Sequence, residues 1–116
     1  MLARADLAPR ARLLELFATL TEGPRPLRGD PFVNAAVELP DPDGRAHRLA
    51  AEYKRRFTER LIDLARAAGA RDAERVGRRL ALLYDGAAAA VVVLDSPEPA
   101  AEAQSVASAI LRDALD

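Results

Sequence analysis

The pattern of apolar and polar positions predicts helices along most of the chain. From about Pro9 to Glu22, apolar side chains recur at spacings of three and four, which places them on one face of a helix. The segment from Arg45 to Ala68 is the clearest amphipathic helix, with an apolar stripe flanked by Arg and Glu. Two further helices are expected from Asp72 to Leu94 and from Pro97 to Leu115.

Proline, glycine and aspartate divide these segments. Asp30 and Pro31 are suited to the first positions of a short helix that ends at Pro40, and DPDG at residues 41–44 is typical of a tight turn. Gly69 is suited to end the helix before it. The sequence therefore predicts an all-α fold, a five-helix orthogonal or antiparallel bundle, in a single domain spanning residues 1–116.

The run from Gly86 to Leu94, GAAAAVVVL, has neither a charge nor a hydroxyl group. A strand here would lack a partner strand, so a helix fits better. Because a helix that is apolar all round is buried on every side, the simplest cover is a second copy of the chain. A central helix wrapped by its own chain remains the alternative. The first interpretation predicts an interface between two copies of the chain. Its residues are Leu83, Ala87, Ala88, Val91, Leu94, Val106, Ile110 and Leu111.

Composition narrows the class of protein. The 17 basic and 18 acidic residues leave a net charge of −1, which gives no electrostatic footprint for nucleic acid. No segment reaches the roughly 20 apolar residues that cross a bilayer, and the first residues lack the apolar core of a signal peptide. We therefore expect a cytoplasmic protein with no membrane contact.

Candidate catalytic groups are few. The chain has no cysteine, and its single histidine, His47, lies among arginines near a helix start, where a surface role is expected. Asp41 and Asp43 resemble the start of a calcium loop, but the residues that follow supply no further ligands. We expect no enzyme activity, no metal and no cofactor.

Bulky residues on the inward stripes could instead line a cavity for a small apolar or aromatic molecule, with two phenol hydroxyls and an amide as polar groups. A plain core is the alternative. Charged ligands are disfavoured, because neither Arg nor Asp falls on an inward stripe. The candidate binding residues are Phe17, Phe32, Val33, Asn34, Tyr53, Phe57 and Tyr84.

Two stretches carry a resemblance to a known family. RGDPFVNAAVELPDPDGRAHRLAAEYKRRFTERLIDLARAAGA, and LLYDGAAAAVVV followed by a proline-initiated, alanine-rich helix, resemble the C-terminal domain of tetracycline-repressor (TetR) type bacterial transcription regulators. The resemblance covers roughly residues 8–115. It implies a ligand-sensing domain of a repressor that forms a homodimer. In this family the last two helices, here 72–94 and 97–115, form a four-helix dimer interface.

In this family a separate helix-turn-helix domain reads DNA, and these 116 residues contain no such motif. The resemblance therefore implies DNA binding only through a domain absent from this sequence. The alternative function is a structural or adaptor helical homodimer without a ligand.

Overall fold

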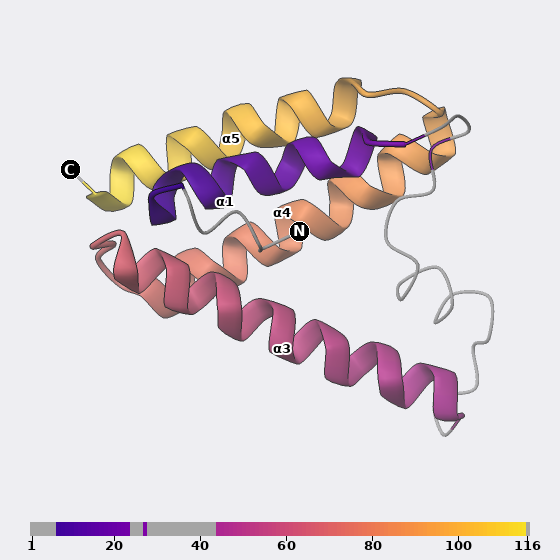
Figure 1. Ribbon diagram of the computed structural model, residues 1–116, viewed down its shortest axis with the longest axis horizontal. Coiled ribbons are helices and arrows are strands. Elements are labelled where there is room, and N and C mark those ends of the chain that lie inside the picture. The colour runs from indigo at the N-terminus through magenta and orange to yellow at the C-terminus, as the bar shows by residue number, and fades with distance from the viewer. Residues whose placement is uncertain (1–6, 24–26, 28–43, 116) are drawn as a thin grey trace.

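The computed structural model describes residues 7–23, 27 and 44–115, and every regular element in this part of the chain is helical. The prediction of an all-α fold is confirmed. The predicted helix from Asp30 to Pro40 lies outside the described residues, as do Phe32, Val33 and Asn34. The elements are α1 (Pro9–Ala18), the 3-10 turn η1 (Thr19–Thr21), α3 (Arg45–Ala67), α4 (Ala73–Leu94) and α5 (Glu98–Leu115) (Figure 1).

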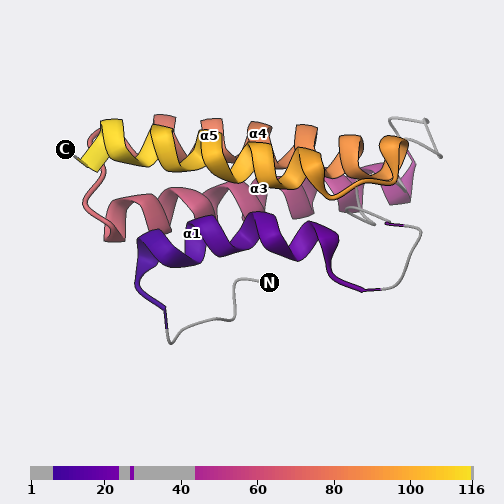
Figure 2. The same cartoon turned by 90° about the horizontal axis from the view of Figure 1, so that it is seen from above.

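The four α-helices are arranged as a ring of neighbours. Helix α1 packs against α3 and α5, and α4 packs against the same two helices from the other side. Figure 2 shows α4 and α5 side by side in one layer, with α1 in the opposite layer. Helix α5 is tied to α1 by the Gln104 amide, which donates to the Leu14 carbonyl at 2.8 Å. The centre of the molecule is therefore enclosed by four different helices.

Local signals fix the helix ends where the sequence places them. The Asp72 side chain accepts a hydrogen bond from the Arg75 backbone N–H at 3.4 Å and so caps α4. Gly69, in the turn after α3, has a φ of +90°, a conformation that glycine adopts without steric cost. Asp95 ends α4 with a φ of +44°, and its carboxylate accepts the Leu27 N–H at 3.1 Å.

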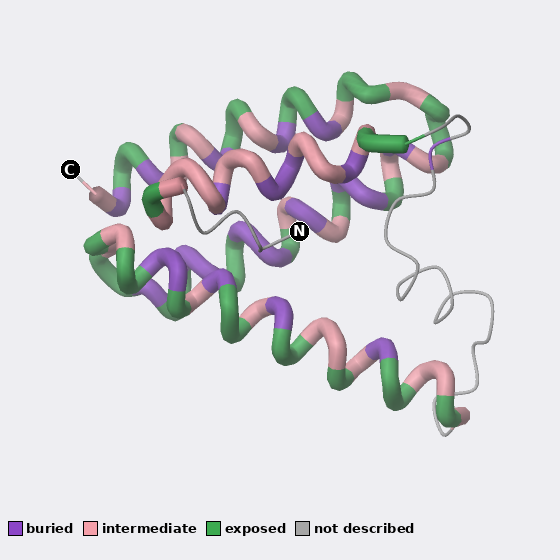
Figure 3. The backbone as a smooth tube through the Cα atoms, in the orientation of Figure 1, coloured by how far each residue is buried: buried purple, intermediate pink, exposed green. Residues whose placement is uncertain are grey.

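The core follows the apolar stripes of the helices (Figure 3). Leucines from α1, α3, α4 and α5 meet at the centre, and small residues of α5 let its backbone lie close to its neighbours. Each buried leucine or valine stabilises the fold by roughly 1.5–3 kcal/mol relative to an exposed one. The largest fully buried side chains are Phe17, Leu13, Leu16, Leu61, Leu80, Leu111 and Val91.

Gly77 marks the close approach of α3 and α4. A Cβ atom placed on Gly77 would lie 2.7 Å from the backbone N and Cα of Ile62 and 2.5 Å from its Cγ1. No larger residue fits unless the two helices separate. The sequence shows only a glycine within a helical segment, so this contact was not predicted.

None of the described helices, the mostly apolar α4 included, is long and apolar enough to cross a membrane.

Candidate functional site

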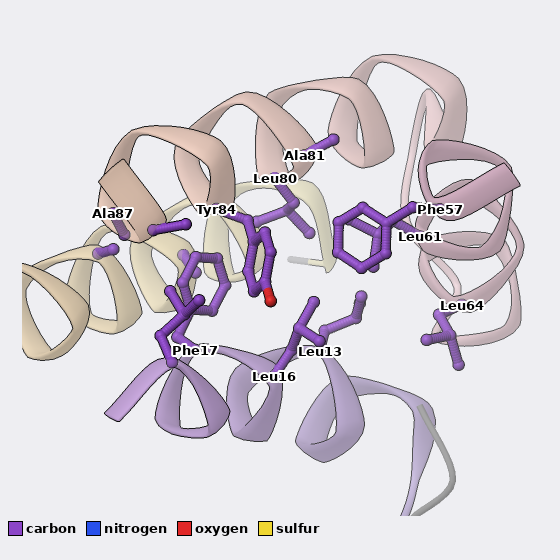
Figure 4. Packing of buried hydrophobic residues seen from close by; sticks show 14 of the residues in the cluster. Leu13, Leu16, Phe17, Phe57, Leu61, Leu64, Leu80, Ala81, Tyr84 and Ala87 are labelled. Carbon is purple, nitrogen blue, oxygen red and sulfur yellow. The ribbon is translucent and has the colours of Figure 1, made fainter. Parts of the chain in front are cut away.

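Three of the seven residues predicted to bind a ligand form the aromatic centre of the core. The Tyr84 ring lies between Phe17 and Phe57, with centroid distances of 6.0 Å and 4.9 Å (Figure 4). These spacings are typical of aromatic pairs in contact. All three side chains are almost fully buried. They pack directly against one another, as the alternative of a plain core requires.

Tyr53 extends this centre toward solvent. Its ring stacks on Phe57 at a centroid distance of 6.2 Å with an interplanar angle of 11°, and the residue is only half-buried. The structure thus brings together four predicted residues from three helices: Phe17 of α1, Tyr53 and Phe57 of α3, and Tyr84 of α4. We call Tyr53, Phe57 and Tyr84 the aromatic cluster.

A charged pair lies on the aromatic cluster. The Lys54 ammonium group forms a salt bridge with the Asp85 carboxylate. The same Nζ lies 4.8 Å from the ring centroid of Phe57, 5.5 Å from that of Tyr84 and 5.9 Å from that of Tyr53. The sequence pattern, which places neither Arg nor Asp on an inward stripe, did not predict this pair beside the rings.

Both members of this pair are partly covered, since the Lys54 side chain is 21% exposed and that of Asp85 is 35% exposed. A cation above ring faces is attracted by their negative potential, and less water around it strengthens that attraction. The chain contains a single lysine among its 17 basic residues. That exception is the one signal in the sequence that could have singled out Lys54.

The predicted dimer residues divide into two groups. The first group is buried inside the single chain and consists of Ala87, Ala88, Val91 and Leu111. Helices α3 and α5 cover the inner side of α4, and helices α1 and α4 cover the inner side of α5. These four side chains already have partners within the chain and do not present a surface to a second copy. An interface between two copies would therefore have to be formed by the remaining predicted residues.

The other predicted interface residues remain accessible. Leu83 and Ile110 are half-buried, while Leu94 is 65% exposed and Val106 is 46% exposed. Two residues outside the predicted interface are more exposed still: Leu82 at 73% and Val93 at 81%.

The exposed apolar residues of α4 form one stripe with helical spacing. Leu82, Gly86, Ala89 and Val93 follow one another at intervals of four, three and four, and all four are exposed. Leu94 lies beside them, and Val106 is exposed on the neighbouring α5. We call these six residues the outer α4–α5 face.

Charges flank the outer α4–α5 face at both ends. Arg75 and Arg79 continue the stripe toward the start of α4, where they line an open groove of about 400 Å³ together with Ile110 and Asp113 of α5. Exposed Glu98 and Glu102 lie at the start of α5, which is the opposite end of the face. The face is therefore apolar in its middle, richer in arginine at one end and acidic at the other.

The start of α3 carries the only histidine of the sequence. His47 lines an open hollow with Arg45, Arg48 and Arg55, and Glu52 is the one carboxylate among the described residues that line it. The Glu52 carboxylate is paired with Arg56 at 2.5 Å. Within residues 7–23, 27 and 44–115, no three acidic, histidine or cysteine side chains are placed to hold a metal ion.

Comparison with models of protein families, with curated proteins and with solved structures found no match to this chain.

Proposed function

We propose that this chain is the ligand-sensing and dimerisation domain of a transcription regulator similar to the tetracycline-repressor type, and that it acts as a homodimer. The observation that carries the proposal is the outer α4–α5 face. In such regulators DNA contact belongs to a separate helix-turn-helix domain, so the proposal assigns to these helices only sensing and dimerisation.

A second copy of the chain is the partner that fits this face. Contiguous apolar surface is uncommon on monomeric proteins and is typical of association sites. Gly86 and Ala89 would allow the backbone of a partner helix to approach closely, while Leu82 and Val93 would fill the seam on either side. Burying such a leucine or valine completely contributes about 1.5–3 kcal/mol.

The charges favour an antiparallel arrangement of the two copies. In a twofold dimer the same face of both protomers meets. If the axis runs perpendicular to α4, each end of the face meets the opposite end of its partner, whereas an axis parallel to α4 would bring ends of like charge together. With the perpendicular axis, Arg75 and Arg79 of one protomer would approach Glu98 and Glu102 of the other. Opposite charges at the rim of an interface accelerate association and fix its orientation more than they raise its affinity.

Sedimentation of the parent and of two variants tests the proposed dimer. The parent should sediment as two chains, and Val93→Glu should sediment as one folded chain, because a glutamate at this exposed position affects only the seam. Leu49→Glu is the matched control: Leu49 is also exposed, but it lies on α3, so the dimer should persist. A parent that stays monomeric at high concentration would refute dimerisation through this face.

The edge of the aromatic cluster supports the sensing part of the proposal. Half-buried Tyr53 and the Lys54–Asp85 pair place polar groups beside apolar rings, as in sites that bind small molecules. The alternative function, a structural or adaptor homodimer without a ligand, is favoured by the close packing of Phe17, Tyr84 and Phe57. A thermal-shift screen of small aromatic and amphipathic compounds distinguishes the two, with Tyr53→Ala as the control variant.

A further inference from the structure

Within the described part of the chain, the Lys54 ammonium group contacts two kinds of partner. Three ring faces lie within 5.9 Å of its nitrogen, and the carboxylate of Asp85 pairs with it. The rings come from two helices, since Tyr53 and Phe57 belong to α3 and Tyr84 belongs to α4. Aromatic faces together with a carboxylate are the groups with which proteins bind organic ammonium ions.

We propose that this arrangement is a binding site for a small organic ammonium ligand. In the absence of the ligand, the Lys54 ammonium group occupies the site. The ligand's head group would take the place of the Lys54 ammonium, against Tyr53, Phe57, Tyr84 and Asp85. This inference deepens the sensing part of the proposed function and rests on it, because it names the class of ligand.

The two charged partners differ in how easily they can leave. Lys54 carries its charge on a flexible four-carbon stem. The side chain is 21% exposed although its Nζ is buried, so the stem has to rotate for the charge to reach water. Asp85 has a short side chain on α4, a helix held in place by α3 and α5. The site therefore releases its cation more easily than its anion.

The electrostatic potential of the rings also favours a cationic ligand over an anionic one. The face of an aromatic ring carries negative potential and attracts a cation. A ligand carboxylate would have to approach both these faces and Asp85, which repel it. With Lys54 rotated out, one carboxylate and three ring faces of the described residues remain, and these four groups favour a positive head group.

Competition with Lys54 predicts how the affinity responds to substitution. If the site is open in only a fraction of the molecules, the apparent dissociation constant rises in inverse proportion to that fraction. Removing the lysine side chain opens the site in every molecule. Lys54→Ala should therefore bind an ammonium ligand more tightly than the parent, which is the opposite of what is expected when a ligand contacts the lysine itself.

Isothermal titration with choline tests the proposal, and 3,3-dimethyl-1-butanol serves as its uncharged analogue of similar shape. Lys54→Ala should bind choline at least tenfold more tightly than the parent and at least tenfold more tightly than it binds the alcohol. Adding Asp85→Asn to Lys54→Ala should reduce choline affinity at least tenfold. Arg56→Ala is the matched control, because Arg56 is an exposed cation on the same helix, and it should leave the parent's affinity unchanged.

Two results would overturn the inference. The first is choline binding to Lys54→Ala that is no tighter than binding of the alcohol, or that is unaffected by Asp85→Asn. The second is binding of benzoate to the parent that disappears in Lys54→Ala, because Lys54 would then be the anchor for an anion. Lys54→Met, which keeps most of the stem, replaces Lys54→Ala if circular dichroism shows that the alanine variant is unfolded.

Sedimentation of the same samples separates this inference from the proposed dimer. Ammonium binding by a chain that stays monomeric would sustain the site and refute dimerisation. A dimer that does not bind ammonium ligands would sustain the proposed dimer and refute the ammonium site.

Discussion

Replacing Gly77 by alanine tests the closest contact between two helices in this fold. The added Cβ would lie 2.7 Å from the backbone N and Cα of Ile62 and 2.5 Å from its Cγ1. The Cγ1 atom can move by rotation of the side chain, but the two backbone atoms cannot. Helices α3 and α4 must therefore separate locally by about 1 Å to restore ordinary contact distances near 3.5–4.0 Å.

The expected magnitude is the difference between two opposing effects. Alanine favours a helix over glycine by about 0.8–1 kcal/mol, which stabilises the variant. Forcing an extra carbon into a packed contact costs about 1–3 kcal/mol, and the backbone atoms at Ile62 place this site toward the upper part of that range. We expect Gly77→Ala to lower the free energy of unfolding by about 1–2 kcal/mol.

Gly86→Ala is the matched control, because a Cβ at Gly86 would meet nothing within 4 Å in the chain. Both substitutions are made in the Val93→Glu background, so that association of subunits does not enter the measured stability. Urea unfolding followed by circular dichroism should show Gly86→Ala stabilised by up to about 1 kcal/mol. If Gly77→Ala were stabilised equally, the close crossing of α3 and α4 would be refuted.

Three further substitutions test other parts of the structure. Val91→Glu should unfold the chain at every protein concentration, in contrast to Val93→Glu. Val91 is fully buried, so the introduced carboxylate would have no partner there. Circular dichroism distinguishes a folded from an unfolded variant. Asp72→Ala should cost about 1 kcal/mol in urea unfolding by removing the cap of α4, and Asp72→Asn should retain most of that stability. Asp95→Ala should cost about 0.5–1.5 kcal/mol by removing the acceptor of the Leu27 N–H, with Asp95→Asn as the conservative control; an unchanged midpoint would contradict that role.

The helices of the described region were predictable because their signals are local. Arg45 to Ala68 was expected as one helix, and α3 spans Arg45–Ala67. The cap at Asp72 and the turn at Gly69 depend on the conformational preferences of single residues, so the residue type alone is enough to predict them. Periodicity likewise predicted that Phe17, Phe57 and Tyr84 point inward, and all three are buried.

The contacts between helices were not predictable from such signals. Lys54 and Asp85 are 31 positions apart, and only the crossing of α3 and α4 brings their charges together. The same crossing depends on Gly77, which in the sequence indicates only a weaker helix. Within the candidate site, the sequence therefore indicated the rings but not the ion pair that lies on them.

The apolar run from Gly86 to Leu94 was correctly predicted as a helix, but the side of that helix that is buried was not predicted. In an amphipathic helix the polar residues reveal which side faces water, but a run without polar residues carries no such information. Its rotation is set by neighbouring turns, where Gly77 contacts Ile62 and Tyr84 lies between Phe17 and Phe57. That rotation turns Val91 inward and leaves Gly86 and Val93 outside. The alternative of a helix wrapped by its own chain therefore holds for the inner side of the run, and the outer side is the part that a second copy would have to cover.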